Sequence, residues 1–342
     1  MKRLFRRNHL CTLPVLLLAL ILNLQGFHTG IVYASEKTSE KLIEEASEGE
    51  PEEASKTVEE LETETESTSE AETEESQHLR DLLDILDHDF FEETGKAGET
   101  WAVSLAVPTD GEYADTNGDM QIKSASVIKV FIMATVCEKV LYPEKGQKPM
   151  EFEESWEGQL QQLLTDMITV SDNTAANTIL EKLGGGDAEK GMKVVNDFCK
   201  KHGYKGTEVG RKFLEQNPKG DNYTTANDCR DILAAISEGT CVSKDASEFM
   251  YDLLKKQTRT WKLPAGLAGT GAVTANKTGE LGGEYGDFVE NDIAIVEADG
   301  TTYVIAVLSS DLKDNGTAQQ KMQHISREVF EYLIHGASQA SG

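Results

Sequence analysis

The chain has 342 residues, of which 39% are hydrophobic, enough for one large globular domain or two smaller ones. Its formal net charge of −27 argues against nucleic-acid binding, which depends on clustered Lys and Arg side chains. Five cysteines are too few for a disulfide-dense scaffold.

Residues 1–34 are expected to be an export signal. A basic start precedes an apolar stretch from Leu10 to Leu24, and Val32-Tyr33-Ala34 offers small residues for cleavage. The alternative is an uncleaved membrane anchor, although Pro14 interrupts the apolar run, which falls short of a spanning helix of about 20 residues. Either way, we expect a secreted or extracytoplasmic protein, membrane-anchored if the signal is retained.

Residues 35–77 are expected to form a disordered acidic linker. They contain 17 glutamates against three lysines and no aromatic residue. Such a segment cannot bury enough apolar surface to offset its ordering entropy. We expect it to be an extended tether to the membrane or cell wall, followed by one globular domain over residues 78–342.

Hydrophobic periodicity predicts the elements of this domain in chain order. Leucines from Leu79 onward predict a helix that ends before Gly95, followed by a strand at 101–107, a turn-rich connection at 111–118 and a central helix at 127–141. Further helices are expected at 157–168, 174–183, 188–202, 226–238 and 244–256, then strands at 272–280, 288–297 and 302–309, and a closing helix at 314–334. The turn Ala298-Asp299-Gly300 joins the last two strands as a hairpin. Strands at both ends predict an α+β fold, an antiparallel sheet flanked by helices with an inserted all-helical lobe.

Three short motifs carry the candidate chemistry, and the first is Ser126-Val127-Ile128-Lys129 at the start of the central helix. Serine and lysine three residues apart lie on one helix face. A buried lysine with a lowered pKa can deprotonate the serine, which makes it a nucleophile. A capped helix with a surface lysine is the alternative, but so apolar a stretch argues against it.

The second motif, Ser171-Asp172-Asn173, lies between two predicted helices. Serine and aspartate are ordinary helix caps. The functional interpretation makes Ser171 a proton relay to a leaving nitrogen and Asn173 a hydrogen-bond partner of the substrate.

The third motif, Lys277-Thr278-Gly279, lies in a predicted strand. A lysine there also protects an edge strand. Functionally, Lys277 and Thr278 would bind a substrate carboxylate, and Gly279 would let the substrate backbone approach the strand. Each motif is weak alone, but their joint order on helix, loop and strand is a strong signal.

The three motifs together resemble the serine β-lactamase and penicillin-binding protein superfamily, whose class A branch combines them. The stretches 167–177, 263–266, 276–279 and 291–295 also look like that branch. The resemblance covers roughly residues 80–335. It implies a two-lobe fold with the site between sheet and helical lobe, no metal and no other cofactor.

The resemblance also implies roles for individual residues. Ser126 would be the acylated nucleophile and Lys129 its proton acceptor, while Ser171 passes a proton to the β-lactam nitrogen. The backbone N–H groups of Ser126 and Glu280 would form the oxyanion hole. Substrate binding would fall to Asn173, Lys277, Thr278 and Gly279.

Two departures from the class A pattern concern substrate turnover and binding. The loop Arg-x-Glu-x-x-Leu-Asn corresponds to residues 211–217, which keep Arg211 and Asn217 but place Phe213 at the glutamate position. Glu215, two residues later, is the only acid in that stretch and a doubtful base for deacylation.

An ion pair between Arg211 and Asp221 is expected to hold this loop across the floor of the site, as similar pairs do in the family. The second departure is Glu290, which precedes Asn291-Asp292 where some class A members carry an arginine that helps to bind the carboxylate.

Three functions remain open from the sequence. The first is a class A-like β-lactamase that opens β-lactams through a Ser126 acyl-enzyme, possibly with slow deacylation. The second is a D-Ala-D-Ala carboxypeptidase or related peptidoglycan acyl-transfer enzyme, and the third is a penicillin-binding module without turnover. All three act on a small β-lactam or D-Ala-D-Ala-type substrate, and we expect a monomer.

Other chemistries have little support in the sequence. No His-x-x-x-His or Cys-x-x-Cys motif is present, so a zinc site is not expected. Four cysteines would survive signal cleavage, either paired or as free buried thiols: Cys137, Cys199, Cys229 and Cys241.

Overall fold

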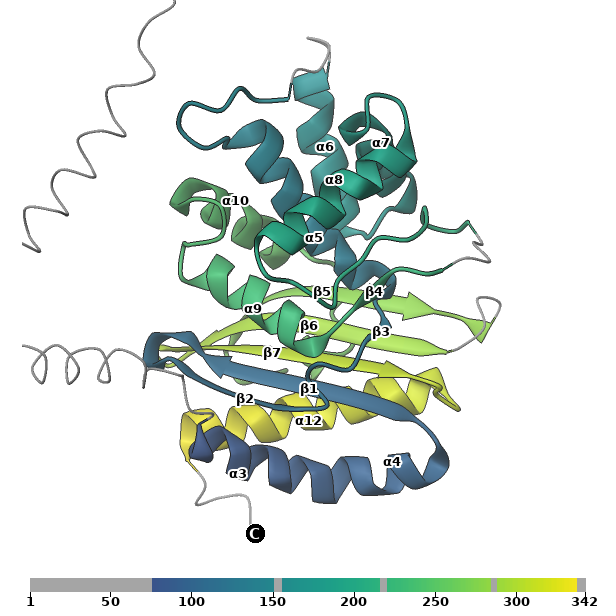
Figure 1. Cartoon of the computed structure of the whole chain (residues 1–342). Coiled ribbons are helices and arrows are strands. Elements are labelled where there is room, and N and C mark those ends of the chain that lie inside the picture. The colour runs from purple at the N-terminus through teal and green to yellow at the C-terminus, as the bar shows by residue number, and fades with distance from the viewer. Residues whose placement is uncertain (1–75, 151–155, 216–219, 284–287, 337–342) are drawn as a thin grey trace, which may run out of the picture. The chain divides into compact units, whose positions relative to one another are not determined.

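The computed structural model describes residues 76–150, 156–215, 220–283 and 288–336 (Figure 1). The expected export signal lies outside the described residues, and so does the expected linker except for residues 76 and 77. Within the described part of the chain, no helix has the length and apolar character needed to cross a membrane.

A five-stranded antiparallel sheet forms the centre of the domain, in the order β2-β1-β7-β6-β5. Its strands are β1 (Thr100–Val107), β2 (Glu112–Thr116), β5 (Val273–Leu281), β6 (Val289–Ala298) and β7 (Thr301–Ser310). The first and last parts of the fold therefore meet at the β1–β7 pair. A second, two-stranded sheet pairs β3 (Ile122–Lys123) with β4 (Tyr223–Thr224).

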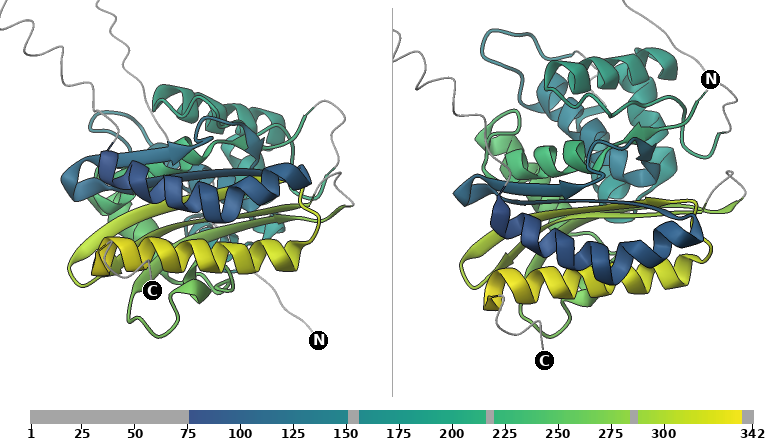
Figure 2. Two further views of the ribbon diagram at one scale, coloured as in Figure 1. Left: turned by 90° about the horizontal axis from the view of Figure 1, so that it is seen from below. Right: turned by 60° about the horizontal axis from the view of Figure 1, so that its bottom comes forward.

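One face of the large sheet is covered by helices from the two ends of the domain, as Figures 1 and 2 show. They are α3 (Gln77–Leu86), α4 (Glu92–Ala97), α11 (Leu263–Gly266) and α12 (Asn315–His335). Strand residues alternate between this side and the other because successive side chains point to opposite faces. Val103 and Ile305 pack with α3 and α12, whereas Ala102 and Val304 belong to the core of the opposite side.

The opposite face carries the all-helical lobe, which is inserted between the strands of the two ends (Figure 1). Its helices are α5 (Lys129–Val136), α6 (Trp156–Thr169), α7 (Asn173–Leu183), α8 (Ala188–Lys201), α9 (Ala226–Ser237) and α10 (Lys244–Lys255). Every residue of α5 is buried, so this helix is the centre of the lobe. The predicted α+β architecture, an antiparallel sheet with flanking helices and a helical lobe, is confirmed.

Two local expectations were wrong. The first helical segment does not end before Gly95 but continues through a π-helical turn (Asp87–Phe91) into α4, and ends where Gly98 adopts a φ of 76°. The connection expected at 111–118 contains strand β2, which pairs with β1 along the edge of the sheet. The expected hairpin is present, and Asp299 and Gly300 both have positive φ, as a two-residue turn requires.

Candidate active site

The candidate nucleophile Ser126 lies in a short 3₁₀ turn (Ala125–Ile128) that leads directly into α5. Ala125 has a φ of 46°, a left-handed conformation that costs an alanine backbone strain and that clusters at functional sites. Asn291 of β6 anchors the turn, because its Nδ2 donates to the carbonyls of Lys123 and Ser124 at 2.9 and 3.1 Å. The sheet therefore fixes the position of Ser126.

Gly279 of β5 allows the strand to lie against this turn. A Cβ atom added at Gly279 would lie 2.8 Å from Ser124 O and 2.9 Å from Ser126 N, both backbone atoms. The structure thus adds a second reason for glycine at this position, the close approach of the nucleophile's turn, to the predicted approach of a substrate backbone. Next to this close approach, Ser126 and Glu280 line the same cleft.

Lys129 lies one helical turn after Ser126 and is fully buried. Its Nζ donates to Ser171 O at 2.8 Å, to Ser171 Oγ at 3.3 Å and to Asn173 Oδ1 at 2.7 Å. Burial lowers the pKa of Lys129 to about 7; Asp172 opposes this shift and Arg259 adds to it. A lysine with this pKa is partly neutral at neutral pH and is able to accept a proton.

Ser171 joins the two candidate lysines. Its Oγ accepts hydrogen bonds from Lys129 Nζ at 3.3 Å and from Lys277 Nζ at 2.9 Å. The hydroxyl hydrogen is then left to donate to another group. Ser171 has a φ of 61°, and Asp172 caps α7 by accepting from Ala175 N at 2.6 Å. The cap and the strained residue together hold the Ser171 hydroxyl between the lysines.

Lys277 and Thr278 are consecutive residues of β5, so their side chains point to opposite faces of the strand, and Lys277 reaches Ser171 of the helical lobe. Lys277 is fully buried, and burial followed by the charges of Lys129 and Arg259 lowers its pKa well below the usual value. The Thr278 hydroxyl is buried and has no hydrogen-bond partner among the described residues. An unpaired buried hydroxyl carries a free-energy cost that a bound substrate would relieve.

The loop that begins at Arg211 forms one wall of the cleft. Arg211 Nε donates to Asp221 Oδ1 at 2.7 Å, so the expected ion pair is formed and is mostly buried. Asn177 of α7 binds both backbone groups of Phe213: its Oδ1 accepts from Phe213 N at 2.8 Å and its Nδ2 donates to Phe213 O at 3.1 Å. The loop backbone is therefore fixed at Phe213. Asn217 lies outside the described residues.

Phe213, and not Glu215, is the loop residue that reaches the candidate lysine. The Phe213 ring is buried, and Lys129 Nζ lies 4.6 Å from its centre. The Glu215 side chain is 57% exposed and forms an ion pair with Lys212 at 2.7 Å. The described residues therefore place an aromatic ring, and no carboxylate, against Lys129 from this loop.

Sequence reasoning missed a charged network beside β5. Arg259 Nη1 lies 3.4 Å from Glu280 Oε2, and its Nε donates to Val170 O at 3.3 Å. The fully buried Lys262 forms ion pairs with Glu280 at 3.3 Å and with Glu290 at 2.5 Å. These residues are far apart in the sequence, and no spacing rule links them.

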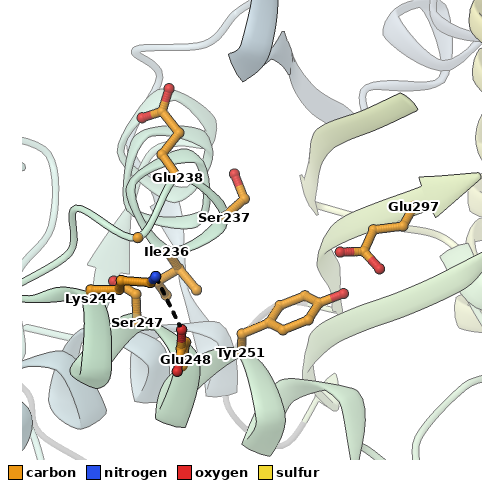
Figure 3. A pocket seen from close by; sticks show the side chains of 9 residues that line it. Ile236, Ser237, Glu238, Lys244, Ser247, Glu248, Tyr251 and Glu297 are labelled. Atoms are coloured by element: carbon orange, nitrogen blue, oxygen red, sulfur yellow. Dashed lines mark ion pairs between the residues drawn. The ribbon is translucent and has the colours of Figure 1, made fainter. Parts of the chain in front are cut away.

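A cavity of about 250 Å³ lies elsewhere, between α9, α10 and the end of β6 (Figure 3). It is lined by acidic and hydroxyl groups, and Tyr251 and Glu297 point toward one another across it. None of the three motifs contributes to it. The candidate site is the smaller cleft that contains Ser126, Asn173, Phe213 and Glu280.

The cysteines are separate from the site. Cys137, Cys199, Cys229 and Cys241 are buried free thiols, which settles the alternative left open by the sequence. In the described part of the chain, no group of three or more His, Cys, Asp or Glu side chains is arranged to hold a metal ion.

Comparison with known proteins shows a family match over most of the domain. The model of the β-lactamase enzyme family matches residues 85–333. The extended-spectrum β-lactamase PER-1 of Pseudomonas aeruginosa is 24% identical over 53% of this chain, which spans 59% of that protein. The β-lactamase CARB-4 of the same organism is 25% identical over 67% of this chain and 83% of its own length.

Solved structures show the same fold. An ancestral class A β-lactamase (GNCA) is 22% identical, with a TM-score of 0.60 over 72% of this chain and 99% of that one. PBP-A is 23% identical, with a TM-score of 0.58 over 75% of this chain and 95% of that one. A leucine-to-glutamate variant of PBP-A is described as an acyl-enzyme complex with penicillin G, and it matches with a TM-score of 0.58 and 23% identity over 74% of this chain and 95% of its own.

Proposed function

This chain belongs to the β-lactamase enzyme family, and we propose that it is a serine hydrolase of the class A type whose Ser126 acyl-enzyme forms faster than it is hydrolysed. The family assignment rests on the match over residues 85–333. The inference that acylation is faster than hydrolysis of the acyl-enzyme rests on the residues around Lys129. A small strained amide such as a β-lactam, or a D-Ala-D-Ala-type peptide, would be the acyl donor.

Acylation begins with attack of Ser126 Oγ on the carbonyl carbon of the substrate. Lys129 Nζ takes the hydroxyl proton, because burial leaves a substantial neutral fraction of this lysine at neutral pH. The backbone N–H groups of Ser126 and Glu280 stabilise the negative oxygen of the tetrahedral intermediate. Loss of one such donor typically costs about 10²–10³ in rate.

The leaving nitrogen needs a proton as its bond to the carbonyl carbon breaks. Ser171 Oγ supplies it and is reprotonated by Lys129, whose Nζ contacts it at 3.3 Å. The proton taken from Ser126 by Lys129 thus returns to the leaving group through Ser171. Lys277 holds the Ser171 oxygen in place and adds positive charge to the site.

The observation that carries the proposal is the position of Phe213. Hydrolysis of the ester requires a water molecule with a proton acceptor within about 3 Å, and general-base help is typically worth about 10²–10⁴ in rate. The Phe213 ring cannot accept a proton, and Glu215 lies on the surface in an ion pair with Lys212. In the described part of the Phe213 loop no carboxylate faces Lys129, so this loop offers no general base for deacylation.

The solved structures that share the fold include PBP-A, which suggests a second candidate function. For that protein, a variant with an introduced glutamate was captured as an acyl-enzyme with penicillin G. A D-Ala-D-Ala carboxypeptidase or a related peptidoglycan acyl-transfer enzyme is therefore the second candidate function, because the same Phe213 geometry would make β-lactams long-lived inhibitors. If the acyl-enzyme were not hydrolysed at all, the protein would act as a penicillin-binding module without turnover.

The deciding experiment is incubation of purified residues 76–342 with a chromogenic cephalosporin, following product release and intact mass together. We expect a burst of about one product per enzyme, a stable adduct on Ser126 and slow further turnover. The Ser126→Ala variant should give neither burst nor adduct. An adduct that persists in this variant, or that maps to another residue, would contradict the assignment.

We further propose that the domain acts outside the cytoplasm, exported by residues 1–34 and held by the acidic segment 35–77. The order of basic, apolar and small residues supports export, and the excess of glutamate supports an extended linker. Fractionation of cells that express the full chain, with N-terminal sequencing of the product, tests both points.

A further inference from the structure

We propose that Glu280 makes the part of the cleft beside Thr278 selective for an uncharged group, so that the preferred acyl donor presents a carbonyl or amide there instead of a free carboxylate. This inference rests on the proposed acylation of Ser126. It concerns the substrate class of the same site, and it departs from the carboxylate recognition that the resemblance implies for Lys277 and Thr278.

The first step of the argument is the position of Glu280. Residues two apart on a strand point to the same face, so the Glu280 side chain lies beside the Thr278 side chain on β5. Glu280 lines the same cleft as Ser126, and 28% of its side chain is exposed. The buried Thr278 hydroxyl has no partner among the described residues. A substrate group bound by this hydroxyl would therefore lie close to the Glu280 carboxylate.

The second step is that the cations nearest the Glu280 carboxylate, Arg259 and Lys262, are already paired. Arg259 Nη1 lies 3.4 Å from Glu280 Oε2, and Lys262 Nζ lies 3.3 Å from Glu280 Oε1. Lys262 also forms an ion pair with the buried Glu290 at 2.5 Å. Two positive and two negative side chains thus balance one another. Lys277 Nζ is directed to Ser171 Oγ and to the backbone oxygen of Thr278, at 2.9 and 2.7 Å.

Lys262 is also held in place by backbone contacts. Its Nζ donates to Gly279 O at 3.1 Å and to Asn291 O at 3.0 Å, and the side chain is fully buried. It is therefore fixed against the sheet and is not free to turn toward the cleft. A carboxylate arriving at Thr278 would find a negative neighbour and no uncommitted cation from this network.

The third step is the chemistry of the Thr278 hydroxyl. A hydroxyl donates equally well to a neutral carbonyl oxygen and to a carboxylate oxygen, so Thr278 itself does not require a charge. A carboxylate would be repelled by Glu280 in a cleft that is partly shielded from water, where like charges repel more strongly than in bulk solvent. An amidated or internally linked peptide, or an esterified β-lactam, avoids this repulsion.

The test compares benzylpenicillin with its carboxyl methyl ester, which differ in this one charge. The second-order rate of Ser126 adduct formation is measured by intact mass for the wild type and for Glu280→Gln, which keeps the backbone N–H and the side-chain shape. We expect Glu280→Gln to raise the rate with benzylpenicillin about tenfold, equivalent to about 1.4 kcal/mol. The readout is the ratio of the ester rate to the acid rate, which should fall about tenfold in Glu280→Gln, because only the acid is relieved of the charge repulsion.

Glu248→Gln is the matched control, because it removes the same charge from an exposed residue of α10 outside the catalytic cleft. It should leave the ester-to-acid ratio as in the wild type. Glu280→Ser is a second variant, in case the glutamine is poorly tolerated, and should lower that ratio in the same direction. Circular dichroism and thermal melting verify that each variant is folded.

An ester-to-acid ratio that is the same in the wild type, Glu280→Gln and Glu280→Ser would overturn the inference while leaving the acylation of Ser126 intact. Absence of a Ser126 adduct with both compounds in the wild type and in both Glu280 variants is a different result. It would overturn the proposed function, and this inference would fall with it.

Discussion

Lys129 and Phe213 face each other in the cleft, with the lysine Nζ 4.6 Å from the centre of the aromatic ring. Two Asn177 hydrogen bonds to the Phe213 backbone fix the ring at this place. The ring excludes water from one side of Lys129 and offers it a cation–π contact when it is charged. Phe213 stands where the class A loop pattern has a glutamate, the residue that the resemblance makes the activator of a deacylating water.

The first prediction follows from this contact. Phe213→Glu should raise the steady-state rate of β-lactam hydrolysis by at least about tenfold, because general-base help is typically worth about 10²–10⁴ and the new side chain starts from the same fixed backbone. Product release and decay of the acyl-enzyme mass measure the effect. Phe213→Leu is the control for loss of the ring and should not speed turnover.

A substitution of Glu215 tests whether this residue, and not a side chain at position 213, is the general base for deacylation. Glu215→Gln should leave turnover within about twofold of the wild type, since this side chain is exposed and paired with Lys212. Rapid wild-type turnover that collapses in Glu215→Gln would show that Glu215 is the base after all.

The second prediction concerns pH. Burial lowers the pKa of Lys129 to about 7, and the proton acceptor must be neutral, so the acylation rate should rise with pH and level off above about 7. In Phe213→Glu, an added negative charge near Lys129 would favour its charged form and move the midpoint upward. Single-turnover acylation rates between pH 5.5 and 9 give both midpoints. A flat profile in the wild type would exclude Lys129 as the acceptor.

The sequence allowed the fold class and the residues near Ser126 to be predicted because their signals are local. Ser126 and Lys129 are one helical turn apart, and periodicity revealed most helices and strands. β2 was missed since it is a short edge strand with mixed burial. The helix through Gly95 was cut short because one exposed glycine weakens a helix by only about 1 kcal/mol and does not by itself end it.

The charged network around Glu280 illustrates what local signals omit. Its four members come from the segment before α11 and from two strands, and only the folded chain brings them together. The inward position of Phe213 likewise depends on Asn177, which lies on α7, 36 residues earlier in the chain. Neither relationship has a spacing that a single sequence reveals.

The third prediction concerns Gly279. Gly279→Ala should reduce the acylation rate by at least about 10²-fold, because the new Cβ would lie 2.8 Å from Ser124 O and 2.9 Å from Ser126 N. Both are backbone atoms, so relief requires β5 and the nucleophile's turn to separate, which disturbs one oxyanion donor or both. Gly282→Ala, where a Cβ meets nothing within 4 Å, is the matched control and should behave as the wild type. Normal acylation of Gly279→Ala would show that the turn is not held as tightly as the structure indicates.

The fourth prediction concerns the ion pair that closes the Phe213 loop. Arg211 and Asp221 side chains are only 7% and 13% exposed, so removing one partner leaves a largely buried charge and should cost about 2–4 kcal/mol of folding stability. Arg211→Ala and Asp221→Ala should both speed proteolysis between residues 209 and 223, measured by mass spectrometry of limited digests. Lys212→Ala removes the exposed pair with Glu215 and should change stability by less than about 1 kcal/mol. Because the loop carries Phe213, loosening the loop should also alter the lifetime of the acyl-enzyme. Unchanged proteolysis in both Arg211→Ala and Asp221→Ala would contradict the prediction and show that the hydrogen bonds of Asn177 and Asn222 hold the loop without the ion pair.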